Sequence, residues 1–158
     1  MTTAAKGADG RATPAAYRTS RIRGKRILYV DDDPSVRCAT NRLLRDAGAV
    51  CLLACTHDQA VALAGGEPSL ALAILDFQMP DGDVGHLIAR LRATRTVFPL
   101  IGTSGTDRRR EFAARGVTQF LEKPWELGDL VRAVDAFPLL RRVARLDPWS
   151  SAASLRGV

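Results

Sequence analysis

Three kinds of side chain in this sequence are placed where they could do chemistry together: a few carboxylates, one hydroxyl and one lysine. Asp31 and Asp32 come directly after a short apolar run, and Asp76 ends a second run. Ser104 and Lys123 follow two further runs. Carboxylates that gather at one place repel one another, so such a cluster either holds a proton or recruits a cation. Oxygen ligands of this kind suit Mg²⁺ or Mn²⁺ rather than zinc.

Asp76 is the side chain around which the other candidates are arranged. It closes the apolar run of segment 72–80 and is followed at once by a Met-Pro turn. A carboxylate can attack a phosphoryl group and form an acyl phosphate, provided that a cation offsets the repulsion between the two anions. Ser104 would donate a hydrogen bond to a phosphoryl oxygen, and Lys123 would pair with the same anion as a compact charge.

Lys123 is also distinguished by composition. Of the 23 basic residues only three are lysines, and the other two, Lys6 and Lys25, lie near the N-terminus. The sequence therefore uses arginine for general surface charge. A single lysine within residues 27–137 indicates a site that needs a small ammonium group rather than a planar guanidinium. A lysine placed on the surface by chance is the alternative.

Alternating strand and helix patterns are predicted to position these side chains. Five short apolar runs have the character of strands, at 27–30, 49–54, 70–76, 98–103 and 117–122. Each is followed by a segment with apolar residues at helical spacing. This alternation predicts an α/β fold, a doubly wound parallel five-stranded sheet with helices on both faces. Because the carboxyl ends of parallel strands meet at one edge, the candidate side chains are expected to come together there.

Four stretches together resemble the receiver domain of two-component response regulators. They are 27–37 (ILYVDDDPSVR), 73–80 (AILDFQMP), 99–105 (PLIGTSG) and 119–125 (QFLEKPW), in the family's order and spacing. The resemblance implies a flavodoxin-like (βα)5 fold and a bacterial phosphorelay. Asp76 would accept a phosphoryl group from a sensor histidine kinase or a histidine phosphotransfer protein. The protein would then be a self-phosphorylating and autodephosphorylating switch rather than a turnover enzyme.

The resemblance implies a Mg²⁺ (or Mn²⁺) site and two positions that control the lifetime of the phosphoryl group. Asp32 matches the carboxylate that binds the metal directly, and Asp31 matches its acidic neighbour, which acts through water. Asp76 belongs to the same set, as does the backbone carbonyl of Gln78. The side chains of Gln78 and Thr106 match the positions that tune access of water to the acyl phosphate.

The resemblance also implies a conformational switch. Ser104 matches the switch hydroxyl, Phe120 the aromatic switch position, and Lys123 the lysine that precedes a proline. Because Phe120 lacks a hydroxyl, switching must work by packing alone. A second departure is Val84, which stands where the family usually has glycine. A β-branched residue resists positive φ, so Gly82 or Gly85 is expected to supply the turn instead. Asp33 has no assigned role and is expected to favour the start of the following helix.

Charge is distributed unevenly along the chain. The formal charge of +6 combines +6 in residues 1–26, −3 in 27–137 and +3 in 138–158. We therefore expect a flexible basic arm at 1–25, the receiver at 26–138 and a basic extension at 139–158 that is partly helical and then disordered. Basic tails attract nucleic acid, anionic lipid or acidic partners, but solvated arms are the simpler interpretation.

Several classes of protein are disfavoured by the sequence. No apolar run approaches the ~18–20 residues of a membrane span, and no secretory signal is present, so a cytoplasmic protein is expected. Three cysteines without framework spacing argue against a disulfide scaffold. Too few residues follow Pro138 for a DNA-binding domain with its own core. A stand-alone receiver with an unidentified output protein is expected, with a possible homodimer through helix 107–114, strand 117–122 and helix 127–134.

Three alternatives stay open. One is a Mg²⁺-dependent phosphohydrolase that forms an aspartyl phosphate. Those enzymes usually have an acidic residue two positions after the nucleophile, where this chain has Gln78, a poor general acid. The second is an adaptor that binds nucleic acid or membrane through its basic tails. The third is a phosphate sink without output.

Overall fold

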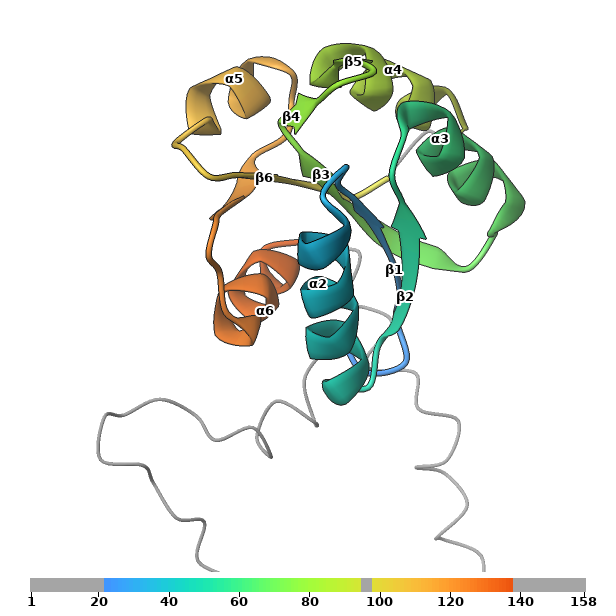
Figure 1. Ribbon diagram of the computed structural model, residues 1–158, viewed down its shortest axis with the longest axis vertical. Coiled ribbons are helices and arrows are strands. Elements are labelled where there is room, and N and C mark those ends of the chain that lie inside the picture. The colour runs from blue at the N-terminus through green and yellow to red at the C-terminus, as the bar shows by residue number, and fades with distance from the viewer. Residues whose placement is uncertain (1–21, 95–97, 138–158) are drawn as a thin grey trace, which may run out of the picture.

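A five-stranded parallel sheet is the centre of the structure, a computed structural model that describes residues 22–94 and 98–137 (Figure 1). The strands of this sheet are β1 (Arg26–Val30), β2 (Val50–Ala54), β3 (Leu70–Asp76), β6 (Leu100–Ser104) and β7 (Gln119–Glu122). Their order is β2-β1-β3-β6-β7, the flavodoxin-like arrangement. The predicted doubly wound α/β fold is confirmed.

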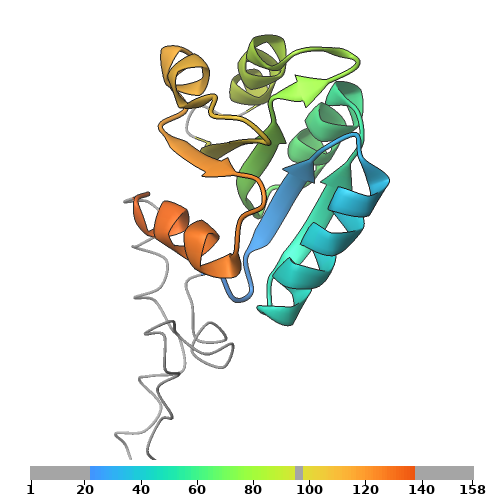
Figure 2. The same ribbon diagram turned by 60° about the vertical axis from the view of Figure 1, so that its left-hand side comes forward.

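Helices cover both faces of the sheet, as Figures 1 and 2 show. One face is covered by α2 (Pro34–Asp46) and α6 (Leu127–Asp135), and the other by α3 (His57–Gly66), α4 (Val84–Thr94) and α5 (Arg109–Ala114). Two hydrophobic cores follow from this arrangement, one on each face. Side chains of successive strand residues enter opposite cores, because residues alternate across a strand.

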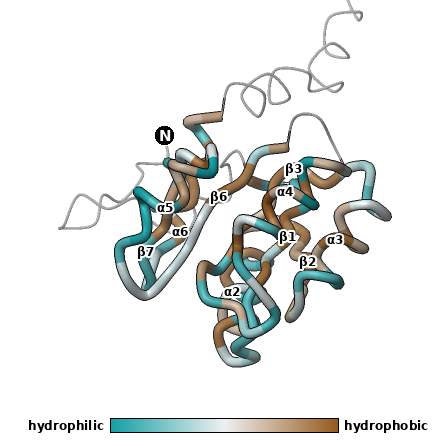
Figure 3. Tube along the Cα trace, turned by 90° about the horizontal axis from the view of Figure 1, so that it is seen from above, coloured by the Kyte–Doolittle hydropathy of each residue, from teal (hydrophilic) through white to brown (hydrophobic). Residues whose placement is uncertain are grey.

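Strand β3 lies in the middle of the sheet and is buried along almost its whole length. Leu72 and Ile74 enter the core beneath α2 and α6, whereas Ala73 and Leu75 enter the core beneath α3, α4 and α5. The hydropathy colouring in Figure 3 shows the same pattern, with apolar strands at the centre and polar segments around them. A strand covered on both faces needs apolar residues at every position, which explains its uninterrupted apolar run.

The register of the strands aligns the candidate side chains at one edge. Val30 pairs with Leu75, so Asp31 follows directly beside Asp76. Asp76 in turn pairs with Thr103 on β6. At this edge, between β1 and β3, the order in which successive strands are added to the sheet changes direction. Open α/β sheets form their ligand-binding sites at such a point.

Helix α2 begins immediately after the three consecutive aspartates at 31–33. Asp33 is its N-cap, and its carboxylate accepts hydrogen bonds from the backbone N–H groups of Ser35 (2.8 Å) and Val36 (3.2 Å). Pro34 occupies the first turn, where its missing N–H has no cost. The expected role of Asp33 at the helix start is confirmed.

The loop after Asp76 contains a small hairpin that the sequence analysis did not predict. The strands β4 (Gln78–Met79) and β5 (Gly82–Asp83) pair in antiparallel orientation. Gly82 has a φ of +153°, and among the described residues only glycines have positive φ. Val84 begins α4 and is buried. The turn therefore uses Gly82 rather than Gly85, and Val84 is accommodated as a core residue.

The receiver domain was predicted to begin at residue 26, but the folded domain already includes Ile22, four residues earlier. Ile22 is fully buried in the core beneath α2 and α6. The N–H of Gly24 donates to the carbonyl of Gly48 at 2.8 Å, and the carbonyl of Lys25 accepts from the N–H of Val50 at 2.8 Å. Residues 22–25 thus belong to the folded domain, because an apolar side chain and two backbone hydrogen bonds hold them to it.

Other parts of the predicted organisation lie outside the described residues. These are positions 1–21 of the arm, residue 138 and the extension 139–158. Within the described ranges, no helix combines the length and the apolar character that crossing a bilayer requires.

Candidate acidic active site

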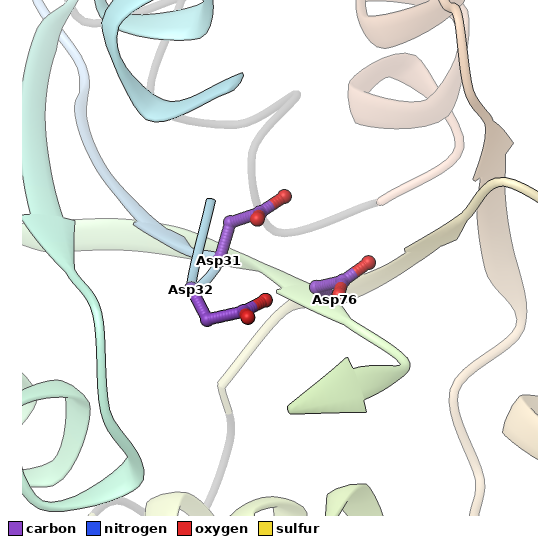
Figure 4. Close-up of side chains that lie close together, drawn as sticks. All are labelled: Asp31, Asp32 and Asp76. Atoms are coloured by element: carbon purple, nitrogen blue, oxygen red, sulfur yellow. The ribbon is translucent and has the colours of Figure 1, made fainter. Parts of the chain in front are cut away.

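Three aspartates from the ends of two neighbouring strands form the candidate site. Asp31 and Asp32 follow β1, and Asp76 ends β3. Each offers a carboxylate oxygen, and these three atoms all lie within 4.8 Å of one another. Figure 4 shows the three carboxylates gathered beside the strand ends. Asp31 and Asp76 are buried, whereas Asp32 is exposed, so the cluster has two interior members and one at its mouth.

Asp31 is fixed by donors on both of its oxygens. Its Oδ2 accepts a hydrogen bond from the Tyr29 hydroxyl at 2.9 Å and from Lys123 Nζ at 2.5 Å. Its Oδ1 accepts from the backbone N–H of Asp33 at 2.9 Å. A carboxylate offers about four lone-pair directions, so only one remains for another partner. This occupancy fits the expected role of Asp31 as an indirect rather than a direct metal ligand.

The turn that carries Asp31 and Asp32 is held by a side chain from α2. Arg37 Nη1 donates to the backbone carbonyls of both aspartates, each at 2.7 Å. Within the described part of the chain, no hydrogen bond to the Asp32 carboxylate is found. Asp32 therefore has a fixed backbone and a carboxylate whose oxygens face solvent, as a direct metal ligand requires.

Lys123 joins the two buried carboxylates. Its Nζ lies 2.5 Å from Asp31 Oδ2 and 2.9 Å from Asp76 Oδ1. The backbone N–H of Lys123 donates to the carbonyl of Ser104 at 2.8 Å, which ties the residue to the end of β6. Burial lowers the pKa of Lys123, but its hydrogen bonds and charge contacts with the two aspartates outweigh burial, so the net pKa is raised. The ammonium group is therefore charged at neutral pH.

The pKa of Asp76 is raised above its ordinary value. Burial is the largest cause, and the charges of Asp31 and Asp32 act in the same direction, while Lys123 partly opposes them. Taking a carboxylate out of water disfavours its ionised form, and neighbouring negative charges do so further. The positive charge of Lys123 thus only partly offsets the negative charge of the three clustered carboxylates.

The residues present fit a hard divalent cation. Three carboxylates from two strand ends supply oxygen atoms close together, one of them at the mouth of the site. Mg²⁺ takes one or two carboxylates and keeps several waters, so it needs such an open, oxygen-rich site. Neutralising the cluster would also relieve the repulsion that raises the pKa of Asp76.

The predicted switch residues lie on β6 and β7, beside the acidic cluster. Ser104 is buried at the end of β6, one residue beyond the partner of Asp76, and its Oγ accepts from the backbone N–H of Thr106 at 3.3 Å. Phe120 is partly buried on β7 and lies 5.9 Å from the ring of Phe112 on α5, centroid to centroid. The two positions are thus on neighbouring strands.

The two predicted lifetime positions are both exposed. Gln78 opens the small hairpin two residues after Asp76, and Thr106 lies in the loop that follows Ser104. Both therefore lie on the solvent side of the acidic cluster, where a side chain can affect the approach of water.

Sequence reasoning missed two residues that support the site, Tyr29 and Arg37. Tyr29 lies two positions before Asp31, so the period-2 rule for strands places both on the same face. A hydroxyl within an otherwise apolar strand was a signal that could have identified it. Arg37 gave no comparable signal, because its contacts depend on how α2 folds back over the turn.

We predict that Asp76→Asn stabilises the metal-free protein at neutral pH. A raised pKa means that the folded state holds the proton of Asp76 more tightly than the unfolded chain does. The associated stability is complete below the ordinary pKa of about 4 and is lost as pH rises through the raised value. Asn is neutral throughout, so its advantage in free energy of unfolding grows with pH.

Urea unfolding of both chains in the presence of a chelator, across a pH series, measures this difference. Comparing the chains at each pH cancels the titration of groups that they share. A pH-independent difference, or an Asn variant that is less stable at neutral pH, would contradict the prediction.

The chain is similar to response regulators in sequence. Residues 27–135 match the family described as the response regulator receiver domain. The two-component response regulator ARR22 of Arabidopsis thaliana is 28% identical over 123 residues, which cover 72% of this chain and 87% of that relative. The response regulator MprA of Mycobacterium avium is 33% identical over 131 residues, which cover 81% of this chain and 56% of that relative.

Solved structures show the same fold. The chemotaxis protein CheY4 of Vibrio cholerae has a TM-score of 0.64 at 24% identity, over 71% of this chain and 97% of that one. The expected flavodoxin-like architecture is therefore confirmed. This chain spans most of ARR22 but only 56% of MprA. From its sequence match and its fold, the chain belongs to the response regulator receiver domain family.

Proposed function

We propose that this receiver accepts a phosphoryl group on Asp76 from a histidine kinase or a histidine phosphotransfer protein and signals by contact with an output protein. The observation that carries the proposal is the position of Asp76: a buried carboxylate within an acidic cluster, with Lys123 Nζ 2.9 Å from its Oδ1. Membership of the receiver family supports it. The proposed partners would place the reaction in the cytoplasm.

In the proposed reaction a carboxylate oxygen of Asp76 attacks the phosphorus of the donor. A new bond forms between phosphorus and Asp76, and the bond between phosphorus and the donor's leaving atom breaks. The electron pair of the broken bond departs with that atom, which is an imidazole nitrogen in a phosphohistidine. The product is an acyl phosphate, which water later hydrolyses.

Two side chains would stabilise the negative charge that arrives on the phosphoryl group. Lys123 already contacts Asp76 Oδ1 as well as Asp31 Oδ2, so its positive charge lies beside the attacking carboxylate. The Ser104 hydroxyl would donate to a phosphoryl oxygen, since it lies buried at the neighbouring strand end. Of the two, Lys123 is in place before the reaction, so its charge needs little reorganisation during it.

A divalent cation is part of the proposal. Asp32 and Asp76 would hold it directly, together with the backbone carbonyl of Gln78, and Asp31 would act through water. When bound, Mg²⁺ supplies positive charge that offsets the repulsion between the carboxylates and an anionic donor. The oxygen-rich donor set described above supports this assignment.

Output would pass through the surface of α5, β7 and α6. Arg109 lies over the ring of Phe120 at 5.2 Å, and Arg108 lies over Phe77 at 4.8 Å. Phe120 also contacts Phe112 of α5. A movement of Ser104 toward a phosphoryl group would free space near Phe120, and repacking of its ring would then move α5. The same surface is the candidate for a homodimer contact.

Gln78 and Thr106 are proposed to set the lifetime of the phosphoryl group. The backbone N–H of Thr106 donates to the Ser104 hydroxyl oxygen at 3.3 Å, so Thr106 adjoins the residue that would contact the phosphoryl group. Exchanging either side chain should change dephosphorylation more than phosphorylation.

Incubation with acetyl phosphate tests the proposal. We expect intact mass spectrometry to detect one added phosphoryl group in the presence of Mg²⁺ and none after chelation. Peptide mapping should locate it on Asp76, and the Asp76→Asn chain is the matched control. An adduct that persists in Asp76→Asn, or that forms equally without a divalent cation, would refute the assignment. Sustained turnover of phosphate monoesters would instead favour the phosphohydrolase alternative.

A further inference from the structure

A tyrosine hydroxyl is buried at the inner wall of the acidic site. Tyr29 lies on β1 with no exposed surface, and its hydroxyl donates to Asp31 Oδ2 at 2.9 Å. The ring is packed in the core beneath α2 and α6, with the ring of Trp125 in edge contact at 6.4 Å between centroids. A buried hydroxyl of this kind needs a hydrogen-bond partner, and the Asp31 carboxylate supplies it.

The hydroxyl determines which lone pairs of Asp31 remain available. With Tyr29 and Lys123 on Oδ2, and the Asp33 N–H on Oδ1, the orientation of the carboxylate is fixed from three directions. Asp31 is almost fully buried, so its orientation depends on these three donors. Without the hydroxyl, Lys123 would be the only hydrogen-bond donor to Oδ2 among the residues that the structure describes.

We propose that Tyr29 is a positioning residue that sets the affinity of the acidic site for its divalent cation. This inference rests on the proposed function, because it assumes that the acidic cluster is a cation site. Tyr29 acts through Asp31: its hydroxyl holds that carboxylate so that its one free lone pair is presented to the cluster. It also holds Asp31 in place beside Lys123, which leaves the ammonium group shared between Asp31 and Asp76.

Removal of the hydroxyl should therefore weaken cation binding. Tyr29→Phe keeps the ring and its contact with Trp125 but removes the donor to Asp31. Partners that orient a direct metal ligand typically contribute 10- to 100-fold in metal affinity. Because Asp31 would act through water, Tyr29 is one step further from the cation, and we expect the dissociation constant for Mg²⁺ to rise by about 3- to 10-fold. Without the hydroxyl, the orientation of the Asp31 carboxylate is no longer fixed in advance. Cation binding must then impose this orientation, which weakens the affinity.

The test is a calorimetric titration of the full chain with Mg²⁺ alone, without a phosphodonor. Three proteins are compared: the natural chain, Tyr29→Phe and Ile74→Val. Ile74 is a fully buried residue of the same core as Tyr29, and Ile74→Val loosens this core by removing one methylene group. It therefore reports the effect of a loosened core on Mg²⁺ affinity when the hydroxyl is intact.

Weaker Mg²⁺ binding in Tyr29→Phe, with unchanged binding in Ile74→Val, supports the proposal. Equal affinities in the natural chain and Tyr29→Phe would overturn it, as would an equal loss in both variants. A natural chain that binds no Mg²⁺ would overturn it as well. Because the titration contains no phosphodonor, its result is separate from the acetyl phosphate test: Asp76 can be phosphorylated while the role of Tyr29 proves wrong.

Discussion

Replacing Lys123 with methionine is expected to slow phosphorylation of Asp76 by about 100-fold or more. Methionine keeps an unbranched stem of similar length but removes the ammonium group that contacts Asp31 and Asp76. Loss of one preorganised group that stabilises developing charge commonly costs about 10²–10³ in rate. Initial rates with acetyl phosphate at saturating Mg²⁺ measure the effect.

The same substitution is expected to tighten Mg²⁺ binding. Lys123 is a positive charge next to two carboxylates, so its removal leaves the acidic cluster more negative and more attractive to a cation. Phosphorylation and cation affinity should therefore change in opposite directions. If both fell together, Lys123 would be acting mainly as a structural support for the cluster.

Lys123→Arg is the matched control, because it keeps the charge and changes its shape. A guanidinium group is planar and has a rigid fork of donors, unlike a compact ammonium group. We expect the Lys123→Arg protein to be phosphorylated more slowly than the natural chain. Its affinity for Mg²⁺ should be closer to the natural value than that of the Lys123→Met protein. This result would separate the requirement for charge from the requirement for a small group.

Gly102→Ala is expected to be the most destabilising of the single changes considered. Gly102 lies on β6, and a Cβ at this position would lie within 2.5 Å of Cγ and Cε2 of Phe112. Phe112 is fully buried between the rings of Phe77 and Phe120, so it has little room to move. Overpacking of a core typically costs about 1–3 kcal/mol, and we expect at least the upper end of this range.

Urea unfolding of Gly102→Ala measures this cost against Gly65→Ala. Gly65 lies in α3, where an added Cβ meets nothing within 4 Å. Alanine is favoured over glycine in a helix by about 1 kcal/mol, so Gly65→Ala should be neutral or stabilising. If the Gly102→Ala protein unfolded at the same urea concentration as the natural chain, the prediction would be wrong. Such a result would show that α5 can move away from β6 at little cost in free energy.

A double-mutant cycle locates the cause of the expected loss. Phe112→Leu removes part of the ring that the new Cβ would meet, so combining it with Gly102→Ala should cost less than the two single changes together. Additive costs would contradict the clash between these two residues. Because Phe112 contacts Phe120, this pair also tests how firmly α5 is held against the proposed switch position.

Much of the candidate site could be predicted because it depends on rules that act along the chain. Each apolar run identified a strand, and four of the five strand ends carried candidate residues, two of them at the end of the first strand. The general property that parallel strands end at one edge then placed Asp31, Asp76 and Lys123 together. The residues of the loop after Asp76 could be assigned in part, because only glycine readily adopts the positive φ found at Gly82.

Other features could not be predicted, because they depend on contacts between residues that only the packing of the folded chain brings together. The sequence showed that Ile22 was apolar but not that it would reach the core, and so the start of the domain was placed too late. The hairpin of β4 and β5 is too short to leave a pattern. The close approach of Gly102 to Phe112 depends on the position of α5 over β6.

The α/β alternation, the acidic cluster and its lysine could all be read from the amino-acid sequence, because strand-end position and side-chain chemistry are local properties. How these groups are held depends on the packing of the folded chain. It placed the Tyr29 hydroxyl and Lys123 on one oxygen of Asp31, and Arg37 on the carbonyls of the turn. Hydrogen bonds are directional over about 3 Å, so they exist only once packing has fixed both partners.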